Sequence, residues 1–190
     1  MPLFRYEGPI QLVRTQDDLL PALERINEER LLGVDTESKP CFHKGMVSPP
    51  ALIQIACSDI VYLIQLTWLP FNKELADFFA NPECVKTGVA IGDDIRQLNK
   101  ICPFTAAGLV DLRDVARMQG LSTNGLRTLA ANFLHMRISK GAQCSNWGNK
   151  ELTSQQVTYA ATDAWISRLV YERMSESGFF AESTTFSIHP

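Results

Sequence analysis

The stretch LLGVDTESKP, residues 31–40, runs from apolar residues into two acids, Asp35 and Glu37. The pattern predicts a β-strand, and since side chains two apart on a strand share a face, the two carboxylates point the same way. Like charges this close repel each other, and a hard divalent cation such as Mg²⁺ or Mn²⁺ between them removes that penalty. The alternative is a strand that ends in solvent, where both acids are harmless. This pair alone does not separate the two interpretations.

The composition is that of an ordinary globular protein. The chain has 190 residues, of which 45% are hydrophobic and 21% charged, enough for one substantial core. A formal charge of −3 argues against nucleic-acid binding mainly by phosphate neutralisation, although bound cations can supply positive charge. Five cysteines without a Cys-x-x-Cys pair indicate reduced thiols. With no signal peptide and no membrane-spanning run, we expect a cytoplasmic protein, or a nuclear one in a eukaryote, without a membrane partner.

Strand and helix signals alternate along the first half of the chain, and helices dominate the second half. We expect strands in residues 10–15, 31–37, 51–66 (a hairpin turning at Ser58-Asp59), 84–91 and 109–111. We expect helices in residues 15–30, 72–80, 93–101, 112–119, 124–135 and 153–177. This order predicts an α/β fold, a mixed β-sheet flanked by helices, in a single domain over residues 1–190. The tail after Gly178 is expected to be loosely held.

The longest predicted helix carries a second candidate pair. Tyr159 and Asp163 are four residues apart and therefore neighbours on one helical face. Small residues surround them, so this face is expected to pack closely, and an aspartate there needs a partner. The alternative is a surface aspartate beside a tyrosine.

A third acid follows from GVAIGDDIRQLNKI, residues 88–101, a strand that turns into a helix. Asp93 shares its helical face with Arg96 and Lys100, which indicates a solvated position. Asp94 shares its face with Leu98 and Ile101 and is expected to point towards the packed side. Asp94 is therefore the candidate site residue of the two.

Together, these acids and the tyrosine resemble the motifs of the DEDD exonuclease superfamily. The motifs are DTE (35–37), GVAIGDDIRQL (88–98) and YAATD (159–163), and the tyrosine is typical of the DEDDy branch. The segments ALIQIA, GLRTLAANFL, KGAQCSNW and LTSQQVTYAATDAW also resemble the exonuclease domains of ribonuclease D and Werner-type proteins, so the likeness spans about residues 31–175. The extra helical domains of ribonuclease D and the Werner helicase are absent from the sequence. We therefore expect a catalytic domain on its own.

The resemblance implies a ribonuclease H-like fold and a 3′-5′ exonuclease that uses two divalent cations, Mg²⁺ or Mn²⁺. It implies that Asp35 bridges both ions and that Glu37 and Asp163 complete the site of the ion that activates water. Asp94 is implied to support the second ion through coordinated water, and Tyr159 to orient the attacking water. The products are nucleoside 5′-monophosphates. The expected partner is nucleic acid: single-stranded DNA or RNA 3′ ends, or short oligonucleotides.

Single strands bind through backbone charge and base stacking, which suggests further contacts. The candidates are Lys39, Phe42, His43 and Lys44 after the first motif, Arg137, Lys140 and Lys150 before the last helix, and Trp147. Each lysine has a solvent-facing alternative, and Trp147 could instead pack against the long helix. Gln54 is expected to pair with a buried backbone group or a carboxylate, and Trp68 and Trp165 to lie in the core. Two other functions stay open: a non-catalytic nucleic-acid-binding module, or a metal-dependent nuclease that cuts internally.

Overall fold

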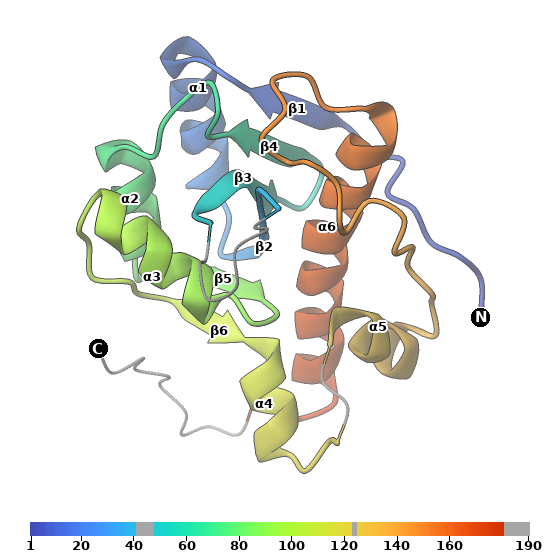
Figure 1. The fold of residues 1–190 in the computed structure, drawn as a ribbon. Helices are drawn as coiled ribbons and strands as arrows, with labels where there is room; N and C mark the ends of the chain where they lie inside the picture. The colour runs from blue at the N-terminus through green and yellow to red at the C-terminus, as the bar shows by residue number, and fades with distance from the viewer. Residues whose placement is uncertain (41–47, 123–124, 181–190) are drawn as a thin grey trace.

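One six-stranded mixed sheet forms the centre of the structure (Figure 1), a computed structural model that describes residues 1–40, 48–122 and 125–180. The strands are β1 (Ile10–Val13), β2 (Leu31–Ser38), β3 (Pro50–Ala56), β4 (Val61–Gln65), β5 (Val85–Gly88) and β6 (Leu109–Asp111). Their order is β1-β4-β3-β2-β5-β6. The β2–β3 and β3–β4 pairs are antiparallel, and the other pairs are parallel. The predicted mixed sheet is confirmed.

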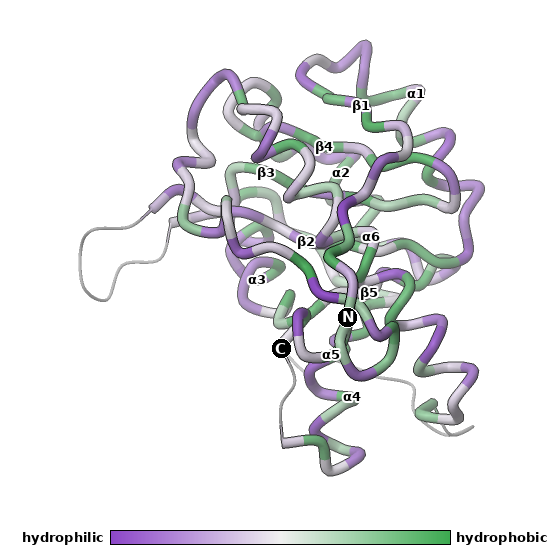
Figure 2. Tube along the Cα trace, turned by 90° about the vertical axis from the view of Figure 1, so that its right-hand side faces the viewer, coloured by the Kyte–Doolittle hydropathy of each residue, from purple (hydrophilic) through white to green (hydrophobic). Residues whose placement is uncertain are grey.

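Helices cover both faces of this sheet. They are α1 (Gln16–Ile26), α2 (Lys73–Ala80), α3 (Gly92–Ile101), α4 (Leu112–Met118), α5 (Leu126–Leu134) and α6 (Ser154–Glu176). In Figure 1, α1, α2 and α3 lie on one face, and α6 crosses the other face with α5 beside it. Figure 2 shows the hydrophilic residues mainly on outer loops and helix surfaces, while every residue of β3 and β4 is buried. No helix of the described residues is long and apolar enough to span a bilayer.

Local sequence signals explain where several helices begin. The Thr15 hydroxyl accepts from the backbone N–H of Asp18, and the Asp18 side chain accepts in return, which forms a capping box. Thr153 and Gln156 form the same box at the start of α6. Pro21 lies inside α1, beyond its first turn. The helix begins before Pro21 because the Thr15 hydroxyl satisfies one of its free amides, that of Asp18.

A close contact between β2 and α6 positions the last helix. A Cβ atom on Gly33 of β2 would overlap the carbonyl oxygen of Ala164 on α6. Ala160, Ala161 and Ala164 are fully buried against the sheet. Small side chains on both elements thus let the two backbones approach, and the residue next to Ala164 is Asp163. This packing brings the helical acid beside the acids of β2.

Replacing Gly33 with alanine is expected to destabilise the protein by at least about 2 kcal/mol, because backbone atoms of α6 cannot yield to the new methyl group as a flexible side chain can. Thermal unfolding should show a melting temperature lower by about 4–8 °C. Gly92→Ala is the matched control, since its new Cβ meets only the Arg96 guanidinium at 3.6 Å, an ordinary contact. Equal melting temperatures for Gly33→Ala and the wild type would show that α6 has room to move.

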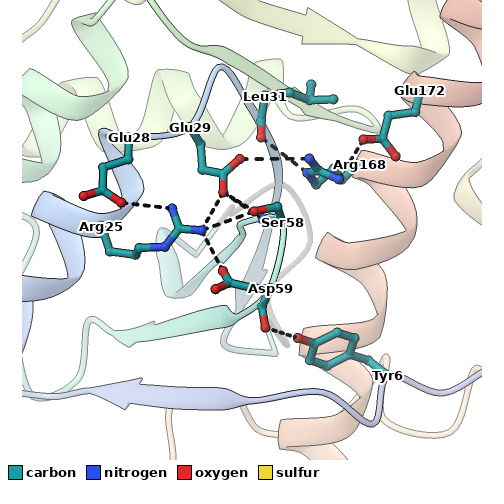
Figure 3. A network of polar contacts seen from close by, with 9 residues as sticks. All are labelled: Tyr6, Arg25, Glu28, Glu29, Leu31, Ser58, Asp59, Arg168 and Glu172. Atoms are coloured by element: carbon teal, nitrogen blue, oxygen red, sulfur yellow. Dashed lines mark hydrogen bonds and ion pairs between the residues drawn. The ribbon is translucent and has the colours of Figure 1, made fainter.

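A polar network surrounds the start of β2, the end of the strand that lies away from Asp35 and Glu37 (Figure 3). Arg168 on α6 donates to the carbonyl oxygen of Leu31 at 3.4 Å and pairs with Glu172 at 2.7 Å. Arg25 at the end of α1 pairs with Glu29 at 2.7 Å and with Asp59 of the hairpin turn at 2.7 Å. The network joins α1, the β3–β4 turn, the start of β2 and α6. The network therefore holds α6 against the start of β2, whereas Asp35 and Glu37 lie towards the end of that strand.

The tryptophans differ from one another in their environment. Trp68 was expected in the core, and this is wrong: it is 43% exposed, in the turn after β4. Its indole N–H donates to the carbonyl oxygen of Lys150 at 2.9 Å, and the Lys150 ammonium lies 4.9 Å from its ring centroid. A surface carbonyl thus satisfies the indole, and a lysine covers part of the ring. Trp165 is partly buried and packs against the ring of Tyr6.

Candidate active site

Three carboxylates from two distant parts of the chain meet at one point. Oxygen atoms of Asp35, Glu37 and Asp163 all lie within 4.8 Å of one another. The alternation of β2 puts the first two on one side of the strand, and the packing of α6 adds the third. Asp35 and Glu37 are partly buried and Asp163 is buried, so β2 does not end in open solvent. The structure therefore favours a cation site over the solvent-exposed alternative.

Asp94 lies in the first turn of α3 and lines the same cavity, although it is outside the three-acid cluster. It is partly buried, whereas the neighbouring Asp93 is exposed and pairs with Arg96. The predicted difference between the two acids is confirmed. Burial raises the pKa of Asp94, and the charge of Asp93 adds to that rise.

Tyr159 lies one turn before Asp163 on α6 and also lines the cavity. Its ring packs against that of Trp147, with a centroid distance of 6.0 Å. Burial raises the pKa of the Tyr159 hydroxyl above its usual value, and the charge of Asp163 adds to the effect. Tyr159 therefore stays protonated at neutral pH and can donate a hydrogen bond.

The cluster acids hold protons strongly when no cation is present. Burial raises the pKa of Glu37 to about 9, with the charges of Asp35 and Asp163 adding to the rise. Burial raises the pKa of Asp163 to about 7, against the opposing effects of the Tyr159 hydroxyl and the Arg127 guanidinium. The pKa of Asp35 is also well above its usual range, because of burial and then the charge of Asp163.

The donor set fits a hard cation. One oxygen of Asp163, Oδ1, is buried and has no hydrogen-bond partner among the residues that the structure describes. A buried carboxylate oxygen without a donor is costly unless a cation or water occupies the adjacent space. Carboxylate oxygens without nitrogen or sulfur ligands are typical of Mg²⁺ and Mn²⁺ sites.

Glu37→Gln is expected to stabilise the metal-free protein at alkaline pH. Because the folded pKa of Glu37 is about 9 and the ordinary value is 4.5, the native state binds this proton more tightly than the unfolded state. The proton's contribution to stability is complete below pH 4.5 and is lost as the pH rises towards 9. In EDTA at pH 8.5, the variant should melt at least about 2–4 °C above the wild type, and near pH 4.5 the difference should shrink.

Two observations would bear on this result. Saturating Mg²⁺ should reduce or reverse the advantage of Glu37→Gln, because a cation removes the repulsion that the substitution relieves. A melting-temperature difference that does not change between pH 4.5 and pH 8.5 would contradict the inferred proton affinity of Glu37.

A cavity of about 380 Å³ surrounds the acids. Besides the acids and Tyr159, its lining includes side chains that the sequence did not indicate: Arg113, Arg127, Ser139 and Gln143. Arginines near the start of predicted helices normally face solvent, so only the fold shows that these two line the site. A second hollow of about 310 Å³ adjoins it, since Ser139, Tyr159 and Asp163 line both.

The residues proposed for substrate contact have varied positions. Lys39 and Lys140 are exposed, and neither lines the two hollows among the described residues. Lys39 instead runs across the backbone of Gly148. Trp147 is 1% exposed and packs beside Tyr159, so its ring offers no face to a base. Phe42 and His43, with Lys44, lie outside the described residues.

Gln54 lies next to the acidic cluster but is not paired as expected. It is directly opposite Asp35 in the β2–β3 register and fully buried. Neither of its amide atoms has a hydrogen-bond partner within the described part of the chain. The expected pairing with a backbone group or a carboxylate is therefore not present in the structure.

Comparison with known proteins agrees with this geometry. Residues 10–178 match a protein family described as 3'-5' exonuclease. The chain belongs to the 3'-5' exonuclease family. Its similarity to the mouse exonuclease 3'-5' domain-containing protein 2 is 34% identity over 164 residues, 80% of this chain and 25% of that protein. Its similarity to the mouse bifunctional 3'-5' exonuclease/ATP-dependent helicase WRN is 30% over 164 residues, 83% of this chain and 12% of that protein.

A solved structure with the same fold is also similar to this chain. The Aedes aegypti Nibbler EXO domain superposes with a TM-score of 0.81 at 23% identity and covers 94% of this chain and 92% of that chain. The resemblance to the exonuclease superfamily and the fold class are both confirmed. The chain spans only about a quarter or less of the two mouse relatives, so their full activities do not transfer directly.

Proposed function

We propose that this protein is a metal-dependent 3′-5′ exonuclease that releases nucleoside 5′-monophosphates from the 3′ ends of single-stranded DNA or RNA or from short oligonucleotides. The observation that carries the proposal is the meeting of Asp35, Glu37 and Asp163 within 4.8 Å, in a cavity that also contains Asp94 and Tyr159. Membership of the 3'-5' exonuclease family supports the same reaction.

The acids are proposed to hold two divalent cations, Mg²⁺ or Mn²⁺. Asp35, Glu37 and Asp163 would supply the ligands of the cluster, with Asp35 shared between both positions. Asp94, outside the cluster but on the same cavity wall, would support the second position. When bound, such cations polarise the phosphodiester and make a nucleophilic water available near neutral pH.

Tyr159 and the cavity walls supply the remaining functions. Because Tyr159 stays protonated, its hydroxyl can hold and orient the attacking water but is a poor general base at neutral pH. The cavity and the adjoining hollow, about 380 and 310 Å³, leave room beside the acids for a terminal nucleotide. The lining of the cavity includes Arg113 and Arg127, whose positive charges suit an anionic strand.

The test is digestion of 5′-labelled single-stranded DNA and RNA oligonucleotides with Mg²⁺, Mn²⁺ or EDTA. The expected result is a ladder that shortens from the 3′ end, with mononucleotide products and no reaction in EDTA. Circular strands should survive, since they have no 3′ end. Degradation of circles would indicate an internally cutting nuclease, and binding without cleavage in either metal would indicate a non-catalytic module.

A further inference from the structure

Arg127 brings a positive charge to the wall of the acidic cavity. It lies in the first turn of α5 and is partly buried. Its side chain lines the same cavity as the cluster acids and is close enough to Asp163 for its charge to act on that carboxyl. The residues around it, Gly125, Leu126 and Thr128, line the cavity too, so the whole first turn of α5 faces the site.

No acid neutralises this guanidinium directly. Within the described residues, Arg127 forms no ion pair, and its Nη1 donates to the neutral amide oxygen of Gln143 at 3.3 Å. Arg113, which also lines the cavity, has no ion pair within the described residues either, but it is exposed, whereas Arg127 is partly buried. Seven other arginines pair with acids: Arg14, Arg25, Arg30, Arg96, Arg117, Arg168 and Arg173. The bond to Gln143 uses one of the five N–H donors of the guanidinium. The other donors are available to an anion in the cavity.

The charge balance of the site with its cations bound indicates which anion Arg127 would bind. On the proposed function, four carboxylates and two divalent cations cancel, and the phosphodiester that is cleaved adds a further negative charge. A guanidinium is suited to that group, because its planar donors match the oxygens of a phosphate.

We propose that Arg127 binds the phosphodiester that is cleaved, donating hydrogen bonds to a non-bridging oxygen while Gln143 fixes the orientation of the guanidinium. This role rests on the proposed exonuclease function. It is separate from cation binding, since Arg127 cannot ligate a metal. It would stabilise the charge that builds on the phosphate oxygens during cleavage.

The experiment compares Arg127→Gln and Arg127→Lys with the wild type on two substrates. One is a single-stranded oligonucleotide, and the other is the p-nitrophenyl ester of thymidine 5′-monophosphate, whose only phosphate is the one cleaved. Arg127→Gln should lower kcat/KM by about 10- to 100-fold on both substrates, as expected for the loss of a charge-assisted hydrogen bond. Arg127→Lys should recover part of the loss. Arg117→Gln is the matched control, because Arg117 is exposed and pairs with Asp114, and it should stay within about twofold of the wild type.

Binding supplies a readout that does not depend on cleavage. With EDTA present, the affinity for a fluorescent oligonucleotide should fall with KCl concentration, and the logarithmic slope should be shallower by about 0.7 in Arg127→Gln. The Arg117→Gln slope should match that of the wild type. A purely structural role for Arg127 would not change this slope selectively.

The outcomes are distinct. Loss on the oligonucleotide with normal cleavage of the nitrophenyl ester would overturn the proposal, because Arg127 would then contact another phosphate. Unchanged kinetics and an unchanged slope would overturn it as well.

A wild type that cleaves neither substrate would refute the proposed function, and an unchanged slope in that case would also refute phosphate binding by Arg127. If Arg127→Gln does not fold, Arg127→Lys decides: unchanged kinetics on both substrates would contradict a requirement for the planar guanidinium.

Discussion

Asp163→Asn is expected to reduce metal-dependent hydrolysis by at least about 1,000-fold while the fold survives. Loss of one cluster carboxylate weakens cation binding and removes several kcal/mol of transition-state stabilisation, and each 1.36 kcal/mol is a factor of ten in rate. The substitution also removes a negative charge beside Asp35, where repulsion already raises the pKa. The metal-free variant should therefore melt no lower than the wild type. Oligonucleotide digestion at saturating Mn²⁺ and thermal unfolding in EDTA measure the two effects.

Asp93→Asn is the matched control for this loss. It makes the same change of charge and shape, but Asp93 is exposed and pairs with Arg96 instead of facing the cavity. Its activity should stay within about twofold of the wild type, since Asp93 is not among the described residues that line the cavity and a surface ion pair contributes little to stability. If Asp163→Asn keeps more than a tenth of the wild-type rate, the cluster is not the catalytic centre.

Tyr159→Phe is expected to lower kcat by about 100-fold with little change in the Mn²⁺ concentration needed for half-maximal activity. Phenylalanine preserves the packing against Trp147, so the substitution removes only the hydroxyl. Proton transfer by a positioned side chain contributes on the order of 10²–10⁴-fold, and we expect the lower end for a phenol that stays protonated and only orients the water. Steady-state rates over a Mn²⁺ titration separate the two quantities.

Tyr171→Phe provides the comparison on the same helix. Tyr171 packs against Phe180, with ring centroids 4.6 Å apart, and is not among the described residues that line the cavity. Its rate should match that of the wild type. A normal kcat for Tyr159→Phe would refute the water-orienting role, whereas a shifted Mn²⁺ requirement with normal kcat would assign the hydroxyl to cation binding.

The positions of the acids were predictable because local periodicity controls them. Alternation on β2 places Asp35 and Glu37 together, and helical spacing distinguishes the exposed Asp93 from the partly buried Asp94. The helix caps at Thr15, Asn72 and Thr153 follow from similarly local hydrogen bonds. Features that depend only on residues close together in the sequence can therefore be predicted before the fold is known.

The rest of the site depends on tertiary placement, which periodicity does not encode. Arg127 faces the cavity only because α5 packs beside α6, and its sequence context is that of a solvated helix start. Trp68 is large and aromatic, yet a carbonyl group in a distant loop holds it at the surface. Trp147 shows the reverse case, since a tryptophan in a polar loop is buried against α6. Long-range contacts decide all three.

The contact of Gly33 with the backbone of Ala164 also has a consequence for protein synthesis. Asp35 and Glu37 leave the ribosome more than a hundred residues before Asp163, and the contact that joins them needs α6 to be released and docked. Until then, the growing chain contains only part of the carboxylate cluster. On the proposed function, the polypeptide cannot attack nucleic acid, including the message from which it is translated, before α6 has been synthesised and has packed against the sheet.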